Sequence, residues 1–158
     1  MKLYLATDHA GFEMKEKIKE FLIKDSEYLG IEVVDLGATE HKDGDNYPHY
    51  MALAGRAVSA DAFHDPSLAV IFGGSGQGEA MVANRFPHVR AFTYTGSSLE
   101  LVKLAKEHND ANVISIGARF VNADQALEAV KLFIQTSFSH DERHAERIIQ
   151  IEEETTNF

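Results

Sequence analysis

The sequence contains no cysteine among its 158 residues. This absence excludes disulfide bonds, thiolate catalysis and zinc–sulfur sites, and it agrees with a cytoplasmic location. No stretch approaches the roughly 18 apolar residues that a membrane-spanning helix needs, and the start MKLYLATDH becomes polar too soon for a signal peptide. Positive charge is also scarce, because 15 lysines and arginines face 25 aspartates and glutamates, for a net charge of -10. We therefore expect neither a membrane nor a nucleic acid as a partner.

The sequence does have enough apolar residues for a full core, since 44% of it is hydrophobic. Short apolar runs alternate with amphipathic ones, a pattern typical of a parallel sheet covered by helices. Strands are predicted at Lys2–Thr7, Ile31–Leu36, Leu68–Phe72, Val89–Tyr94 and Val113–Ile116. Helices are predicted at 12–24, 47–60, 79–83, 99–106, 122–136 and, after a capping box formed by Ser139 and Glu142, to about residue 152.

The predicted architecture is a three-layer α/β/α sandwich, in which a doubly wound (Rossmann-like), five-stranded parallel sheet is followed by an additional C-terminal helix. We expect residues 1–151 to form a single domain and residues 152–158 to form a flexible acidic tail. The last helix carries Ile148, Ile149 and Ile151, which need an apolar surface to cover them. A neighbouring subunit is a plausible source of that surface.

The third predicted strand leads into the segment Gly73–Glu79, which reads GGSGQGE. Its four glycines allow backbone angles and close approaches that a Cβ atom would prevent. Three familiar loop motifs do not fit this segment. The dinucleotide fingerprint needs glycine, and the P-loop needs lysine, where Glu79 stands. The nucleophile elbow needs glycine at the position of Gln77.

What remains is a strand, a glycine-rich turn and a helix N-terminus, which together direct several main-chain N–H groups at one point. The Glu79 carboxylate beside them would repel a bound phosphate. It would suit a transient oxyanion whose proton the carboxylate has just removed. The alternative is a tight strand-to-helix turn in which the helix dipole alone favours Glu79.

Polar residues also follow other predicted strands, at the sheet edge where ligands bind in such folds. Asp8 and His9 follow the first strand and Arg119 follows the fifth. Asp8 could equally be a helix cap with His9 at the surface. The polar turn that contains His108 and Asn109 precedes the fifth strand, so we expect it at the opposite edge. Its spacing alone indicates a helix C-cap rather than catalysis.

Arg143, His144 and Arg147 fall near one face of the last predicted helix. A cationic face in an acidic chain could bind a phosphate, or it could form solvated ion pairs with neighbouring glutamates. Tyr47 either packs as a structural aromatic residue or lines a pocket. The other histidines show no metal-ligand spacing with carboxylates, so no metal site is predicted.

Seven motifs stand in one order along the chain. They are Asp8–Gly11, Asp35–Gly37, Tyr47–Tyr50, Gly73–Glu79 with Ala83–Arg85, Glu107–Val113, Gly117–Arg119 and Arg143–Arg147. Together they resemble the type B ribose-5-phosphate isomerases, in the family that also holds the galactose-6-phosphate isomerase subunits. The resemblance runs from Met1 to about Ile151.

This resemblance implies an enzyme that interconverts ribose 5-phosphate and ribulose 5-phosphate through a cis-enediolate, without a metal or any other cofactor. Many members of the family carry a cysteine base at the position of Gly73. A subgroup uses a glutamate a few residues later, and Glu79 matches that subgroup. The alternatives are the same chemistry on a tetrose or hexose phosphate, such as allose or galactose 6-phosphate, and a regulator that binds a sugar phosphate without catalysis.

The resemblance also implies roles for the individual residues. Glu79 would move the proton between C2 and C1, and His108 would open the furanose ring. Groups that would stabilise the enediolate are Ser75, Asn109 and the main chain at Gly74, Gly76, Gln77 and Gly78. Asp8 would bind substrate hydroxyls and Tyr47 would form a wall of the pocket. Phosphate ligands would be His9, Arg119, Arg143 and Arg147, with His144 as a lesser pocket residue. A homodimer, or a tetramer as the alternative, would share each site between two chains.

Overall fold

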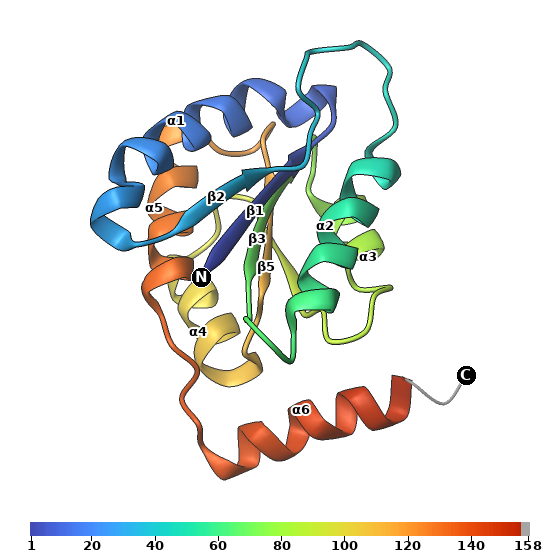
Figure 1. The fold of residues 1–158 in the computed structure, drawn as a ribbon, viewed down its shortest axis with the longest axis vertical. Helices are drawn as coiled ribbons and strands as arrows, with labels where there is room; N and C mark the ends of the chain where they lie inside the picture. Colours follow the sequence, from blue (N-terminus) through green and yellow to red (C-terminus); the bar gives the residue numbers. More distant parts are fainter. Residues whose placement is uncertain (156–158) are drawn as a thin grey trace.

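The computed structural model describes residues 1–155, and the side chains of all of these except residues 25–29. At its centre is the predicted five-stranded parallel sheet, whose strands lie in the order β2-β1-β3-β5-β4 (Figure 1). Its strands are β1 (Lys2–Thr7), β2 (Glu32–Asp35), β3 (Leu68–Gly73), β4 (Ala91–Tyr94) and β5 (Val113–Gly117). The central strands β1, β3 and β5 are almost wholly buried, whereas the edge strands β2 and β4 are partly exposed. Burial on both faces explains the unbroken apolar runs of the central strands.

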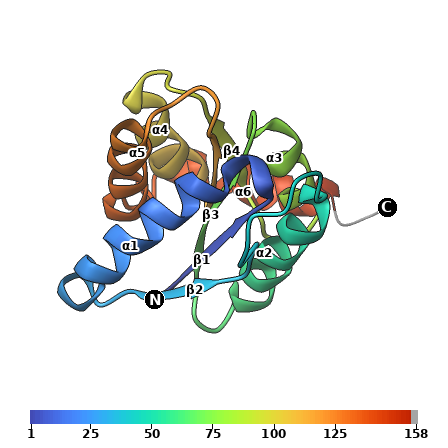
Figure 2. The same ribbon diagram turned by 90° about the horizontal axis from the view of Figure 1, so that it is seen from above.

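Helices cover both faces of the sheet. Viewed from above, α1, α4 and α5 lie on one side and α2 and α3 on the other (Figure 2). The helical elements are η1 (His9–Gly11), α1 (Phe12–Leu29), α2 (Tyr47–Asp61), α3 (Gln77–Ala83), α4 (Leu99–Asn109), α5 (Ala123–Gln135) and α6 (Glu142–Thr155). Each side has its own apolar cluster. No helix among the described residues is both long enough and apolar enough to span a bilayer.

Local sequence signals explain where several helices begin. Pro48 lies in the first turn of α2, where its missing N–H costs nothing. Asn122 caps α5 by accepting a hydrogen bond from Gln125 N, and Oε1 of Gln125 accepts one from Asn122 N. The capping box expected for α6 was wrong. Ser139 lies three residues before the helix and contacts Asp141 N and His144 Nδ1 instead.

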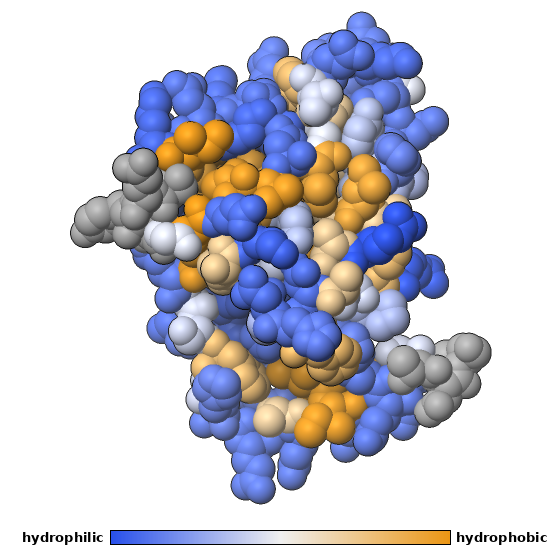
Figure 3. Space-filling model, in the orientation of Figure 1, coloured by the Kyte–Doolittle hydropathy of each residue, from blue (hydrophilic) through white to orange (hydrophobic). Residues whose placement is uncertain are grey.

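Helix α6 lies across the amino-terminal end of the sheet and packs against the end of α4 (Figure 1). It continues to Thr155, so the first four residues of the expected flexible tail are helical, and residues 156–158 lie outside the described part of the chain. The Glu152 carboxylate accepts a hydrogen bond from His88 N at 3.2 Å, which holds this last part of the helix. Hydrophobic side chains gather at the bottom of the molecule, in the region of α6 (Figure 3). Ile149 and Ile151 are about half exposed, at 56% and 46%.

Candidate active site

The sheet order places two of the predicted motifs on either side of one crevice. Strands β1 and β3 are neighbours, and the chain runs from β1 to β2 on one side but from β3 to β4 on the other, an arrangement that in doubly wound sheets leaves a crevice at the carboxyl ends of the two strands. Asp8 follows β1 and the glycine loop follows β3. Ligands of doubly wound sheets bind at this kind of position.

The glycine loop (residues 73–78) turns the chain from β3 into α3. Gly76 has a left-handed backbone with φ of 78°, a conformation that favours glycine. Its carbonyl oxygen accepts hydrogen bonds from Ser115 Oγ at 2.6 Å and Thr93 Oγ1 at 3.2 Å, which fix the loop to β4 and β5. Ser75 and Gln77 are exposed at the tip. The loop is therefore fixed to β4 and β5 through Gly76, while its tip is exposed to solvent.

Glu79 lies in the first turn of α3 and its side chain is buried, with only 5% of the residue exposed. Its carboxyl group folds back over Gly73, so that a Cβ atom added at Gly73 would overlap it and would stand 2.7 Å from Glu79 Cγ. Burial raises the pKa of this carboxyl group, and the charge of Asp8 adds to the rise. The guanidinium of Arg119 and main-chain N–H groups of Gly76 and Glu79 act in the opposite direction. Glu79 is thus a buried carboxyl group with a raised pKa at the carboxyl edge of the sheet.

Two other side chains lie directly on the glycine loop. A Cβ atom at Gly74 would be 3.1 Å from Cζ of Arg119, and one at Gly78 would be 2.5 Å from the hydroxyl oxygen of Tyr47. Both contacts depend on glycine, since any other residue would push the side chains away. Tyr47 comes from the start of α2 and Arg119 from the end of β5. The structure therefore brings Glu79, Arg119 and Tyr47 together around the loop.

Asp8 and His9 complete this edge of the sheet. Asp8 is buried and caps η1 by accepting a hydrogen bond from Ala10 N at 3.0 Å, which is the capping role that its position also allowed. His9 is held by Asp45, whose Oδ1 lies 2.8 Å from both His9 N and His9 Nδ1. The hydrogen bond that the His9 side chain donates to Asp45 raises the pKa of His9. The sequence analysis missed Asp45, because nothing in its loop signals a partner 36 positions away.

Asp8, His9 and Asp45 are also the described residues whose ligand atoms lie close enough, within 4.8 Å of one another, to hold a metal ion. Their geometry is that of a hydrogen-bonded pair, because His9 Nδ1 and Asp45 Oδ1 face each other at 2.8 Å. A metal ion at this place would need a lone pair on His9 Nδ1. That nitrogen has no free lone pair when it carries a proton and donates it to Asp45.

The other predicted site residues lie at the opposite, amino-terminal edge of the sheet. His108 and Asn109 end α4, and His108 stacks on His144 of α6 with 4.2 Å between the ring centroids. His144 is buried, its Nδ1 lies 3.1 Å from Ser139 Oγ, and burial lowers its pKa. Arg143 and Arg147 are exposed on α6. Within the described side chains, neither guanidinium has a carboxylate within 4.0 Å, so the ion pairs considered from the sequence do not form.

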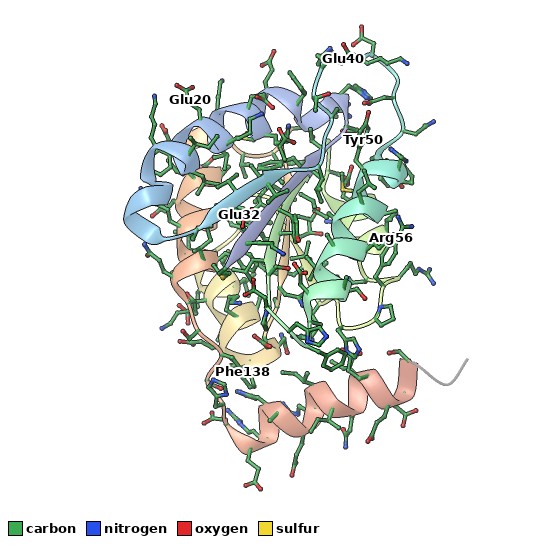
Figure 4. The ribbon with its side chains drawn as sticks, viewed as in Figure 1. Glu20, Glu32, Glu40, Tyr50, Arg56 and Phe138 are labelled. Atoms are coloured by element: carbon green, nitrogen blue, oxygen red, sulfur yellow. The ribbon has the colours of Figure 1, made fainter. Side chains whose placement is uncertain are left out.

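One chain therefore carries two half-sites that it does not bring together. We call the set around the glycine loop the carboxyl-edge half-site and the set on α4 and α6 the amino-edge half-site. The charges that act on Glu79 are those of Asp8 and Arg119, while those that act on His144 are those of His108, Arg143, Asp141 and Arg147. Figure 4 marks the two ends of the molecule, with Glu40 and Tyr50 near the carboxyl ends of the strands at the top and Phe138 beside α6 at the bottom.

Comparison with known proteins agrees with this geometry. The sequence model of the family described as Ribose/Galactose Isomerase matches residues 3–151. The chain is 38% identical over 148 residues to ribose-5-phosphate isomerase B of Mycobacterium tuberculosis (strain CDC 1551 / Oshkosh), covering 94% of this chain and 86% of the relative.

Solved structures give the same result. Ribose-5-phosphate isomerase B of Clostridium thermocellum superposes with a TM-score of 0.86 at 31% identity, covering 97% of this chain and 96% of that one. The enzyme of Mycoplasma genitalium, solved with bound ribulose-5-phosphate, superposes with a TM-score of 0.89 at 29% identity, covering 99% and 97%. The family match and these similarities extend over nearly the whole chain, and the protein belongs to the ribose/galactose isomerase family.

Proposed function

We propose that this protein is an aldose–ketose isomerase that interconverts ribose 5-phosphate and ribulose 5-phosphate in the cytoplasm, with Glu79 as the base. The observation that carries the proposal is the buried Glu79 carboxylate, which lies over Gly73 beside the exposed tip of the glycine loop. Relatives that are named for this reaction, and a neighbour with ribulose-5-phosphate bound, support the choice of substrate.

The proposed chemistry moves two protons within the sugar, one from C2 to C1 through Glu79 and one from O2 to O1, and needs no outside reagent. The Glu79 carboxylate removes the hydrogen of C2 as a proton, and the electron pair left behind forms the C1–C2 double bond of a cis-enediolate. The developing charge on O1 is stabilised by main-chain N–H groups of the glycine loop and by Ser75. The hydroxyl proton of O2 then moves to O1, and Glu79 returns its proton to C1, which leaves the carbonyl at C2.

The raised pKa of Glu79 predicts the acid side of the pH–rate profile. A carboxyl group can accept the C2 proton only when it is ionised, so kcat should fall as the pH drops through the Glu79 pKa. Because burial raises that pKa, the midpoint should lie above the value of about 4.3 for an ordinary glutamate. The measurement is kcat at saturating ribose 5-phosphate across the acid range, after confirming that the protein stays folded. A midpoint at or below 4.3 would contradict the assignment.

The two half-sites lead us to propose a homodimer in which each active site takes one half-site from each chain. Glu79, Asp8, His9, Tyr47 and Arg119 would come from one chain. From the partner would come His108 for ring opening, Asn109 for the enediolate, and Arg143 and Arg147 for the phosphate, with His144 supporting them. The exposed Arg143 and Arg147, which lack a carboxylate partner among the described side chains, support this arrangement. A twofold axis would make both sites equivalent.

Mixing two inactive variants tests the shared site. We expect Glu79→Gln homodimers and Arg143→Ala/Arg147→Ala homodimers to be nearly inactive. A heterodimer of the two would contain one intact site, so unfolding and refolding an equimolar mixture should restore about one quarter of the wild-type activity. Each variant refolded alone is the control. If the mixture were no more active than the sum of the two controls, each site would lie within one chain.

A substrate panel tests the choice of sugar. At matched enzyme concentration we expect the highest kcat/KM for ribose 5-phosphate, compared with allose 6-phosphate, galactose 6-phosphate and erythrose 4-phosphate. A higher value for a hexose or tetrose phosphate would support the alternative of the same chemistry on another sugar. Binding of these compounds without any turnover would support a regulator that only binds sugar phosphates.

A further inference from the structure

The loop of residues 38–46 contributes one buried carboxylate to the carboxyl-edge half-site, and none of the roles given above uses it. Asp45 has a side chain that is only 8% exposed, although its neighbour Asp43 is 95% exposed. Its Oδ1 accepts a hydrogen bond from His9 N at 2.8 Å and lies 2.8 Å from His9 Nδ1. A single carboxylate oxygen therefore fixes both the main chain and the ring of His9.

This contact decides which ring nitrogen of His9 faces the crevice. A carboxylate accepts hydrogen bonds and cannot donate them, so Nδ1 must carry its proton toward Asp45. The ring can then offer only Nε2 to a ligand. We propose that Asp45 is a positioning residue that holds His9 with Nε2–H directed at the substrate phosphate. This inference rests on the proposed function, in which His9 is a phosphate ligand.

The charges around His9 support a role in anion binding. Two carboxylates face the His9 ring. Asp8 Oδ2 lies 3.7 Å from His9 Nδ1, and Oδ1 of Asp45, in the loop of residues 38–46, lies 2.8 Å from the same nitrogen. His41 packs edge-on at 6.4 Å between the ring centroids, and the hydroxyl of Tyr50 acts on Asp45 rather than on His9. The hydrogen bond to Asp45 is the largest cause of the raised pKa of His9, and Asp8 adds to it. His9 thus keeps a positive charge at a pH where an ordinary histidine loses it.

The test compares Asp45→Asn with Asp43→Asn. Both variants remove one negative charge from the same loop, but only Asp45 contacts His9. The first measurement is the 15N NMR titration of His9 in the protein without substrate, assigned with a His9→Asn spectrum. In the wild type we expect a midpoint above 6.5 and a neutral form protonated at Nδ1. Asp45→Asn should lower the midpoint, and Asp43→Asn should leave it near the wild-type value.

The second measurement uses sulfate, a divalent anion whose charge stays constant between pH 5 and 9. At a pH between the His9 midpoints measured for the wild type and for Asp45→Asn, we expect Asp45→Asn to weaken sulfate binding about 10-fold by calorimetry, because a charged hydrogen bond to His9 is lost. KM for the sugar phosphate should rise with it, while kcat changes little. Combined with His9→Asn, the same change should have no further effect on sulfate, which separates positioning from a general change of the fold.

The outcomes are distinct. An unchanged His9 titration in Asp45→Asn, or an equal shift in Asp43→Asn, would overturn the inference. An equal loss of sulfate affinity from Asp45→Asn with and without His9 would overturn it as well. If the titration and the sulfate data agreed with expectation but no sugar phosphate were isomerised, the role of Asp45 would be supported and the proposed function would be wrong.

Discussion

Replacing Glu79 by glutamine is expected to lower kcat by about 10²- to 10⁴-fold, the range that a positioned general base contributes. Glutamine has nearly the same shape but cannot accept a proton from C2. The melting temperature should stay the same or rise, because the buried carboxylate is desolvated in the folded protein and the amide removes that cost. Affinity for the sugar phosphate should change little, since the phosphate ligands are untouched.

A matched control is available in α4. Glu100 also lies in the first turn of a helix, but it is exposed. Glu100→Gln should therefore leave kcat and KM near the wild-type values. If Glu79→Gln retained near wild-type turnover in the same assay, Glu79 would have no part in the proton transfer.

Adding a single methyl group at Gly73 is expected to remove most of the activity without unfolding the protein. The Cβ atom of Gly73→Ala would occupy the space of the Glu79 carboxyl group, so this flexible side chain must move away from Gly73. A displacement of this kind should lower kcat about as much as the loss of the base, by roughly 10²-fold or more. The melting temperature should change little, because only the end of a side chain has to move.

Two comparisons make this prediction specific. Gly73→Ala in the Glu79→Gln background should cause little further loss of kcat, since both changes act on the same group. Gly11→Ala should instead lower the melting temperature, because its Cβ atom would stand 2.9 Å from the main-chain carbon of Phe72. Full activity of Gly73→Ala would show that Glu79 does not act from the position seen over Gly73.

Much of the fold could be predicted from local sequence signals. The runs Leu3–Ala6 and Val70–Phe72 are buried on both faces of the sheet, and their continuous apolar composition predicted this burial. The ends of the helices were predicted less accurately than the strands. Helix α6 continues past Glu152 because the carboxylate of Glu152 contacts His88, and no local pattern reveals a contact 64 positions away.

The carboxyl-edge half-site could also be predicted in large part. In doubly wound sheets the ligand site lies at the carboxyl ends of the strands, which is where Asp8 and the glycine loop stand in the sequence. The glycines explain how closely Arg119 and Tyr47 approach the loop. Asp45 could not be predicted, because its loop fixes no spacing to His9. Of the amino-edge half-site, the turn that contains His108 and Asn109 was placed correctly at the opposite edge, whereas the last helix was not placed at either edge. Its link to the same chemistry came from the resemblance to the isomerase family, because one chain keeps the two sets apart.

The central claim is that Glu79 moves a proton between C2 and C1 of the sugar. Its most direct test is hydrogen exchange between the solvent and C1 of the substrate. Ribulose 5-phosphate is incubated with the protein in D₂O, and deuterium at C1 is followed by NMR. The account predicts that the wild type incorporates deuterium at C1 while it isomerises the sugar, and that Glu79→Gln at the same concentration incorporates almost none. Exchange by Glu79→Gln at the wild-type rate, or isomerisation by the wild type with no deuterium incorporated, would contradict it.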